Sequence, residues 1–170
     1  MKVGRIQTLK VNRISDFGLY LVDEEGQEVL LPNRYVSLEN AVGDELQVFV
    51  YHDSEDGLVA TTEQPLIMEG QVAALKVVDK SIHGAFLDWG LAGKDLFLPN
   101  RNQQGGVVVG SYKAVYLYVD NITDRCVATL KLKQYVNNED IIKFTKIKCT
   151  CLAIVMTATS LLTAACSLGG

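Results

Sequence analysis

An internal repeat constrains the fold of this chain more than any other feature. Residues 4–62 match residues 70–129 at an offset of 66, which grows to 68 after two single-residue insertions. Such insertions are tolerated in loops between elements. The chain is therefore predicted to hold two copies of one small fold. The aligned pairs include Gly4 and Gly70, Gly18 and Gly84, Pro32 and Pro99, and Tyr51 and Tyr118.

Each copy has the pattern of an all-β unit of about five short strands. Apolar and polar positions alternate over residues 46–51 and 114–119, and turn-forming residues follow both segments. Strands this short are best protected by closure into a small barrel, which removes exposed sheet edges. We predict one barrel in residues 1–65 and a second in 66–135. A stiff linker at 63–69, containing Pro65, would restrict their relative orientation.

The segments 17–21 and 83–87 read Phe-Gly-Leu-Tyr-Leu and His-Gly-Ala-Phe-Leu. Both resemble the aromatic–Gly–small–aromatic–aliphatic strand of the S1-type RNA-binding domain, which has the oligonucleotide-binding (OB) fold. The longer combination of the blocks 14–18, 28–32, 58–62 and 84–90 is similar to the N-terminal half of the bacterial conserved virulence factor B family. The resemblance covers about residues 1–140. It implies two tandem OB barrels in a bacterial RNA-binding regulator of post-transcriptional or virulence gene expression.

The resemblance, together with the places of Arg34 and Arg101 two residues after each proline and of the single tryptophan Trp89 after the second aromatic strand, predicts a set of RNA-binding residues. Aromatic rings stack unpaired bases, and basic side chains meet phosphates. A bulge at Gly18 or Gly84 is expected to turn the neighbouring aromatics toward one surface. For Tyr20 and Phe86, the alternative is a place in the barrel core. For Trp89 the alternative is packing between the barrels, and for Arg34 and Arg101 it is a solvated cation on a loop. The predicted RNA-binding residues are Phe17, Tyr20, Arg34, His83, Phe86, Trp89, Arg101 and Arg125.

The two units differ in charge and in two family positions. Residues 1–66 hold 5 Lys and Arg against 12 Asp and Glu, a net charge of −7, whereas residues 67–135 hold 8 against 6, a net charge of +2. Pro32 and Pro99 stand where many S1-type domains have a histidine, and only the second unit has a basic residue, Arg125, after its last hairpin turn. We therefore expect single-stranded RNA to bind mainly to the second barrel. A protein-interaction adaptor, with other proteins as its partners, is the alternative.

The sequence does not predict an enzyme. His52 and His83 lie in different units without a nucleophile motif, and Gly105-Gly106 has no following lysine to form a phosphate loop. No metal is expected, because Cys149 and Cys151 lack partner ligands at zinc spacing. No cofactor or small-molecule substrate is expected either. Without an export signal at its start, the chain is expected in the cytoplasm.

Residues 136–170 do not continue the repeat. The stretch 149–170 has no charged residue, but its six hydroxyl side chains argue against a membrane anchor. We interpret 136–170 as an atypical apolar tail, helical or disordered, from a frameshifted or truncated reading frame.

Overall fold

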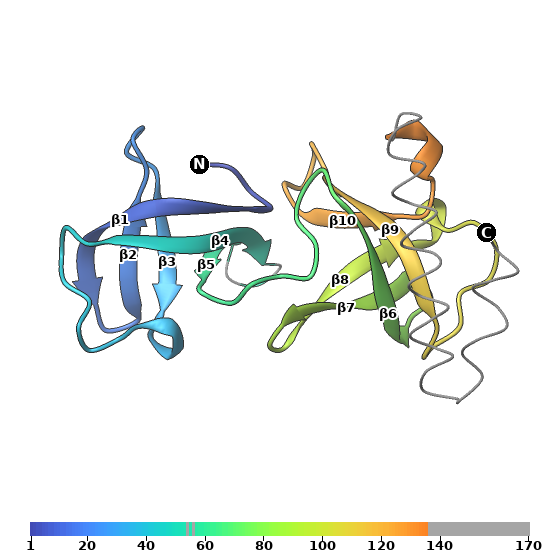
Figure 1. Ribbon diagram of the computed structural model, residues 1–170, viewed down its shortest axis with the longest axis horizontal. Helices are drawn as coiled ribbons and strands as arrows, with labels where there is room; N and C mark the ends of the chain where they lie inside the picture. The colour runs from blue at the N-terminus through green and yellow to red at the C-terminus, as the bar shows by residue number, and fades with distance from the viewer. Residues whose placement is uncertain (54, 56, 136–170) are drawn as a thin grey trace, which may run out of the picture.

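The computed structural model describes residues 1–53, 55 and 57–135, which form two small barrels joined by a short linker (Figure 1). The first barrel contains β1 (Arg5–Ser15), β2 (Gly18–Val22), β3 (Glu28–Pro32), a 3-10 turn η1 (Asn33–Tyr35), β4 (Glu45–Asp53) and β5 (Gly57–Thr61). The second contains β6 (Val72–Lys80), β7 (Gly84–Leu91), β8 (Lys94–Pro99), η2 (Asn100–Asn102), β9 (Tyr112–Val119) and β10 (Cys126–Thr129), followed by η3 (Leu132–Gln134).

Both barrels close with the same strand order. The first runs β1-β2-β3-β5-β4, and the second runs β6-β7-β8-β10-β9. In each, a single parallel contact completes an otherwise antiparallel sheet: Leu30 pairs with Val59, and Phe97 pairs with Val127. Two tandem five-stranded OB barrels, as the repeat predicts, are confirmed.

The bulge that we expected beside Gly18 lies elsewhere. The register shift falls in β1, between Val11 and Arg13, where this long strand passes from pairing with β4 to pairing with β2. Phe17 occupies the turn before β2, so strand alternation does not determine its direction. The glycine is required for a different reason, because a Cβ atom on Gly18 would lie 2.0 Å from the carbonyl oxygen of Leu31.

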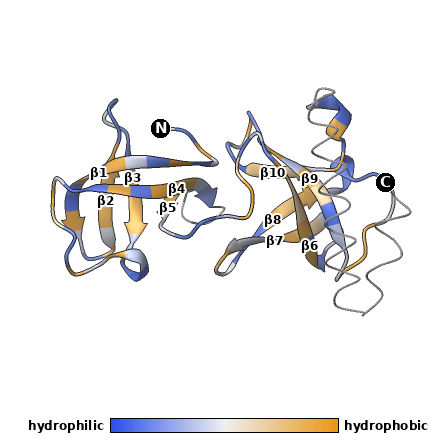
Figure 2. Ribbon diagram, viewed as in Figure 1, coloured by the Kyte–Doolittle hydropathy of each residue, from blue (hydrophilic) through white to orange (hydrophobic). Residues whose placement is uncertain are grey.

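The repeat extends to the buried core. Nine apolar side chains fill the first barrel, and each aligns with a buried apolar side chain of the second at the offsets of the repeat. Hydrophobic colour follows the strands, while several hairpin tips are hydrophilic (Figure 2). The paired core positions are Leu9 and Leu75, Val11 and Val77, Leu19 and Ala85, Leu21 and Leu87, Val29 and Leu96, Leu31 and Leu98, Val48 and Val115, Val50 and Leu117, and Ala60 and Ala128.

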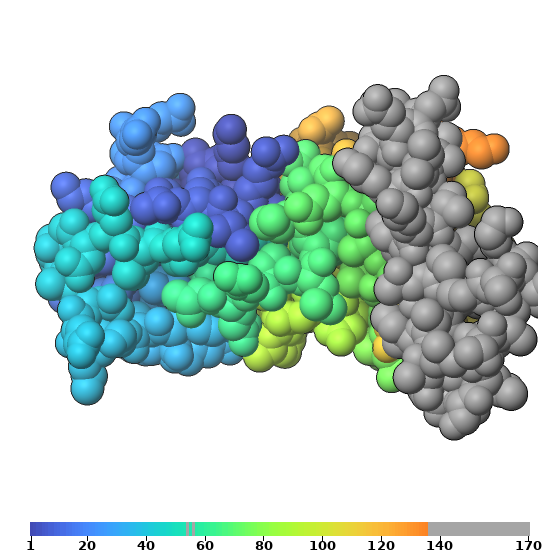
Figure 3. All heavy atoms as spheres, viewed as in Figure 1, coloured from blue at the N-terminus to red at the C-terminus, as the bar shows by residue number. Residues whose placement is uncertain are grey.

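The two barrels meet in an apolar junction. Phe49 and Tyr51, on the outer face of β4, belong to one buried cluster with Trp89 of β7 and with Ile67 of the linker. Polar contacts also hold the linker, since the Arg5 guanidinium lies 2.6 Å from a Glu69 carboxylate oxygen. In the space-filling view the blue and cyan atoms of the first barrel run directly into the green atoms of the linker (Figure 3). The contacts therefore give the barrels a defined mutual orientation.

Candidate nucleic-acid interface

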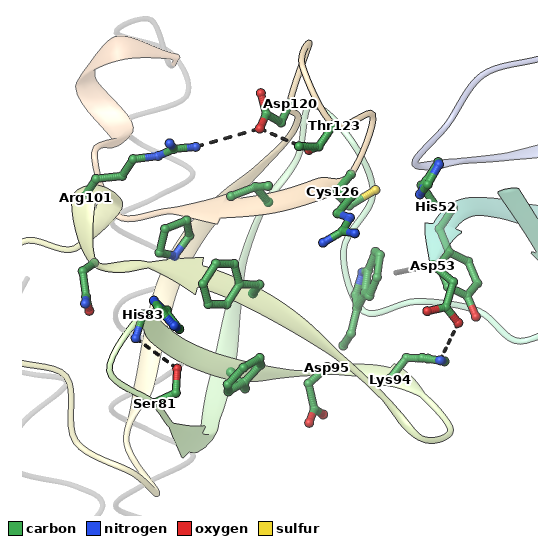
Figure 4. A pocket seen from close by; sticks show the side chains of 18 of the residues that line it. His52, Asp53, Ser81, His83, Lys94, Asp95, Arg101, Asp120, Thr123 and Cys126 are labelled. Carbon is green, nitrogen blue, oxygen red and sulfur yellow. Dashed lines mark hydrogen bonds and ion pairs between the residues drawn. The ribbon is translucent and has the colours of Figure 1, made fainter. Parts of the chain in front are cut away.

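An open groove of about 890 Å³ lies on the second barrel and reaches the end of β4 in the first. His83 and Ser81 lie at one end of it, and His52 and Asp53 lie at the other (Figure 4). Five of the eight residues predicted from sequence line this groove, and all five belong to the second unit. They are His83, Phe86, Trp89, Arg101 and Arg125.

The turn between β6 and β7 presents His83 at the rim of the groove. The Ser81 hydroxyl accepts a hydrogen bond of 3.2 Å from the His83 backbone N–H, and the Asn100 backbone N–H donates one of 3.0 Å to the His83 carbonyl. The Asn100 side chain also donates to the Ile82 carbonyl, 2.7 Å away. These bonds fix the backbone on both sides of the imidazole and leave its side chain exposed.

Phe86 and Phe97 form an aromatic pair on the floor of the groove. They are cross-strand partners on β7 and β8, and their ring centroids lie 5.4 Å apart. Both rings are half-buried and point outward, whereas their neighbours Leu87 and Leu96 fill the barrel interior. The sequence alternation of β8 would have identified Phe97, but its counterpart in the first unit is Leu30, so the repeat gave no aromatic match.

Basic side chains lie along the groove. The Asp120 backbone N–H donates a hydrogen bond of 2.9 Å to the Arg125 carbonyl, closing the β9–β10 hairpin beside the exposed Arg125. The exposed Arg101 lies 3.9 Å from a carboxylate oxygen of Asp120. Lys94 pairs with Asp53 across the two barrels. Within the described residues, Arg125 is therefore the groove cation with no ion-pair partner.

The three predicted residues of the first barrel lie outside the groove. Phe17 is exposed in the turn before β2. Tyr20 is half-buried, and the guanidinium carbon of Arg13 lies 3.7 Å above its ring centroid. Arg34 lies in η1, where its guanidinium covers the ring of Tyr35 at 4.8 Å. The structure does not bring these three side chains together with those of the second barrel.

Trp89 is built into the junction. It is 5% exposed, and its ring meets Phe49 and Tyr51 edge-on at centroid distances of 5.6 and 5.8 Å. Its indole N–H donates a hydrogen bond of 3.0 Å to the Ile67 carbonyl. This burial favours packing between the barrels, one of the two roles considered from the sequence, over base stacking.

Tyr51 and His52 line the groove from the first barrel, and the sequence gave no sign of this role. Burial, with a smaller contribution from Asp53, raises the pKa of Tyr51 to about 12, so its phenol is neutral at physiological pH. The Nδ1 atom of His52 is buried and makes no hydrogen bond in the described part of the chain. Both positions reach the groove only because the barrels dock as they do, and strand periodicity carries no information about docking.

Two further groups define the chemistry of the groove. The pKa of Asp95 is raised, first by burial and then by the carboxylates of Asp88 and Asp79. Burial, followed by Glu69, raises the pKa of the Cys126 thiol to about 12, so this sulfur is protonated at neutral pH and is poorly suited to act as a nucleophile. The groove thus offers aromatic faces and hydrogen-bonding groups to a ligand.

Residues 1–53, 55 and 57–135 contain neither a metal-binding cluster nor a membrane-spanning helix. No group of three or more His, Cys, Asp or Glu side chains is placed to hold a metal ion there. The helical segments among these residues are the short 3-10 turns η1, η2 and η3, and none of them could span a bilayer. The expectations for residues 136–170 fall outside the described residues.

Comparison with known proteins gave relatives of both units. The S1 domain family matches residues 3–63 and again residues 70–131. The uncharacterized protein YitL of Bacillus subtilis (strain 168) is 36% identical over 93 residues, which are 54% of this chain and 31% of that protein. A crystallised multidomain protein with nucleic acid binding domains from Streptococcus pneumoniae superposes with a TM-score of 0.64 at 20% identity, covering 83% of this chain and 48% of that one.

This chain spans less than half the length of either relative. The structural match supports the fold, and the two segments that match the family contain all five strands of each barrel. The chain belongs to the S1 domain family, and it carries two copies of the domain in tandem.

Proposed function

We propose that this chain is a non-catalytic nucleic-acid-binding module that takes single-stranded RNA in the groove of its second barrel. The observation that carries the proposal is the outward-facing pair of Phe86 and Phe97, with His83 and Arg125 also lining the groove. Unpaired bases stack on such rings, each for about 1 to 3 kcal/mol, without a fixed sequence. Membership of the S1 domain family and the likeness to a multidomain nucleic-acid-binding protein support this function.

The groove differs from a simple basic channel, because carboxylates balance its cations. A strand bound here gains mainly from stacking and hydrogen bonding, and its affinity should fall only gently with salt. For single strands the slope of log K against log salt is about −0.7 per phosphate contact. The balanced set consists of Lys94, Arg101 and Arg125 against Asp53, Asp95 and Asp120.

The test is a titration of the full chain with a fluorescently labelled RNA of about ten unpaired nucleotides, within the usual site size of an OB fold. Phe86→Ala should weaken binding at every salt concentration. Arg125→Ala should weaken binding and reduce the salt slope by about 0.7. Lys76→Ala is the matched control, since it removes one exposed cation from β6 outside the groove and should change neither quantity.

We further propose that this binding serves a bacterial regulator of post-transcriptional or virulence gene expression, with a cytoplasmic location, as the family resemblance implies. A protein-interaction adaptor is the second candidate. The first barrel favours it, because its charge is −7 over residues 1–66 and Arg13 covers Tyr20 on its outer face. Absence of RNA binding by the wild-type chain at low salt would select the adaptor.

A further inference from the structure

The outer faces of the two barrels differ at equivalent positions. In the first barrel, Arg13 covers the ring of Tyr20 and is held by Glu28, whose carboxylate oxygen lies 3.1 Å from the guanidinium. A base could stack on Tyr20 only by displacing this cation. In the second barrel the partner of Phe86 on β6 is Asp79, and the ring contacts only another aromatic, Phe97, among the ring and cation contacts of the described residues.

The first barrel nevertheless reaches the groove through the end of β4. Tyr51, His52 and Asp53 line it, and His52 and Asp53 lie at the end opposite His83 (Figure 4). Nδ1 of His52 is buried and makes no hydrogen bond within the described residues, so the half-buried imidazole keeps an unused hydrogen-bonding group that a ligand could engage. Histidine can both stack on a base and donate a hydrogen bond to phosphate.

The junction holds this histidine in register with the second barrel. Trp89 packs against Tyr51 from one side, and Lys94 pairs with Asp53, the residue after His52. The relative freedom of the barrels is thus lost during folding and not during binding. Such preorganisation increases affinity for a ligand that contacts both parts.

We propose that the binding site is a composite of both barrels, in which a strand stacked on Phe86 and Phe97 continues across the junction onto His52. This inference rests on the proposed function and adds a residue and a ligand length to it. The first barrel then contributes through the tip of β4, while its own outer face remains closed by Arg13. The affinity for an oligonucleotide too short to cross the junction should not depend on His52.

The test compares two labelled single-stranded RNAs, of about four and about ten nucleotides, on the full chain. His52→Ala should weaken binding of the longer RNA at least about fivefold, the loss expected for one stacked base, and leave the shorter RNA unaffected. Gln47→Ala is the matched control, because it truncates an exposed polar side chain of the same strand outside the groove. Unchanged tryptophan emission would show that the junction stays intact in both variants.

The outcomes separate this inference from the proposed function. If Phe86→Ala weakens binding but His52→Ala binds both RNAs like wild type, the composite site is wrong and the groove of the second barrel stands. Equal weakening of both RNAs by His52→Ala also overturns the inference, because the histidine would then act locally. Failure of the wild-type chain to bind either RNA overturns both proposals.

Discussion

The indole N–H of Trp89 donates a 3.0 Å hydrogen bond to the carbonyl of Ile67, and this contact ties the second barrel to the linker. A second hydrogen bond runs from the linker to the barrel, because the Leu66 backbone N–H donates to the Trp89 carbonyl at 2.8 Å. Trp89 thereby joins three parts of the molecule: the outer face of β4, the linker and the core of the second barrel. The two barrels should consequently unfold as one cooperative unit.

Substitution of Trp89 tests this coupling. Trp89→Ala should lower the free energy of unfolding by about 3 to 5 kcal/mol, because it empties a buried aromatic site. Trp89→Phe keeps most of the packing but leaves the Ile67 carbonyl unpaired, at a cost of about 1 to 3 kcal/mol. Urea denaturation followed by circular dichroism measures both, with Ile82→Ala as an exposed control that should change little.

In the wild-type chain the tryptophan itself reports on the junction, because Trp89 is the single tryptophan. Its fluorescence should follow the same denaturation curve as the circular dichroism signal of the whole chain. A fluorescence transition that clearly precedes the loss of β-structure would mean that the junction opens while the barrels remain folded, and the proposed cooperativity would be wrong.

Glycine at the start of β7 should be indispensable. A Cβ atom on Gly84 would lie 2.3 Å from the Leu98 carbonyl oxygen, a backbone atom that cannot rotate away. Gly84→Ala should therefore destabilise the chain by about 1 to 3 kcal/mol or more through overpacking. Gly106→Ala is the matched control, since a Cβ there meets nothing within 4 Å, and thermal unfolding should show little change or a slight gain.

The sequence predicted the barrels well because their cores repeat. Every interior position of the first barrel has an apolar partner at an offset of 66 to 68 residues, as Leu21 has in Leu87, and period-two alternation assigns such residues to one face. The predicted bulge at Gly18 is wrong, because the register shift lies in β1 between Val11 and Arg13. The structure uses the missing side chain of Gly18 to let β3 approach closely.

The site was predictable only in its local part. His83, Phe86 and Arg125, which line the groove, were predicted because each occupies a position of the S1-type pattern within one unit, and Arg101 was predicted because it follows Pro99 as Arg34 follows Pro32. His52 was missed, since it lines the groove only after the barrels dock. Docking depends on the match between an aromatic patch on one barrel and an indole on the next, and no short-range pattern encodes that match.

Asp95 should make stability depend on pH in a specific direction. Partial desolvation, followed by the carboxylates of Asp88 and Asp79, raises its pKa above the ordinary value of 3.8, so the ionised carboxylate disfavours the folded state. This penalty is absent below pH 3.8 and grows as the pH rises through the raised pKa. Asp95→Asn should therefore raise the melting temperature at pH 7 but not at pH 3. Because the side chain is largely exposed, the gain should be at most a few tenths of a kcal/mol.

A melting temperature that rises equally at both pH values would show that the asparagine acts by some means other than removal of charge. Lys80→Gln at the end of β6 serves as the control for surface charge, because it neutralises an exposed side chain outside the groove.

Asp120 should restrain RNA binding by holding the groove's second arginine. Its carboxylate lies 3.9 Å from Arg101 and also accepts hydrogen bonds from the Thr123 hydroxyl and the Ile122 backbone N–H. Asp120→Asn keeps an oxygen for the turn but removes the negative charge, so Arg101 becomes available to phosphate. Binding should tighten, and the salt slope should steepen by about 0.7, the value of one added phosphate contact. The double variant Asp120→Asn with Arg101→Ala should lose this gain; if it retains the gain, Arg101 is not the group that Asp120 restrains.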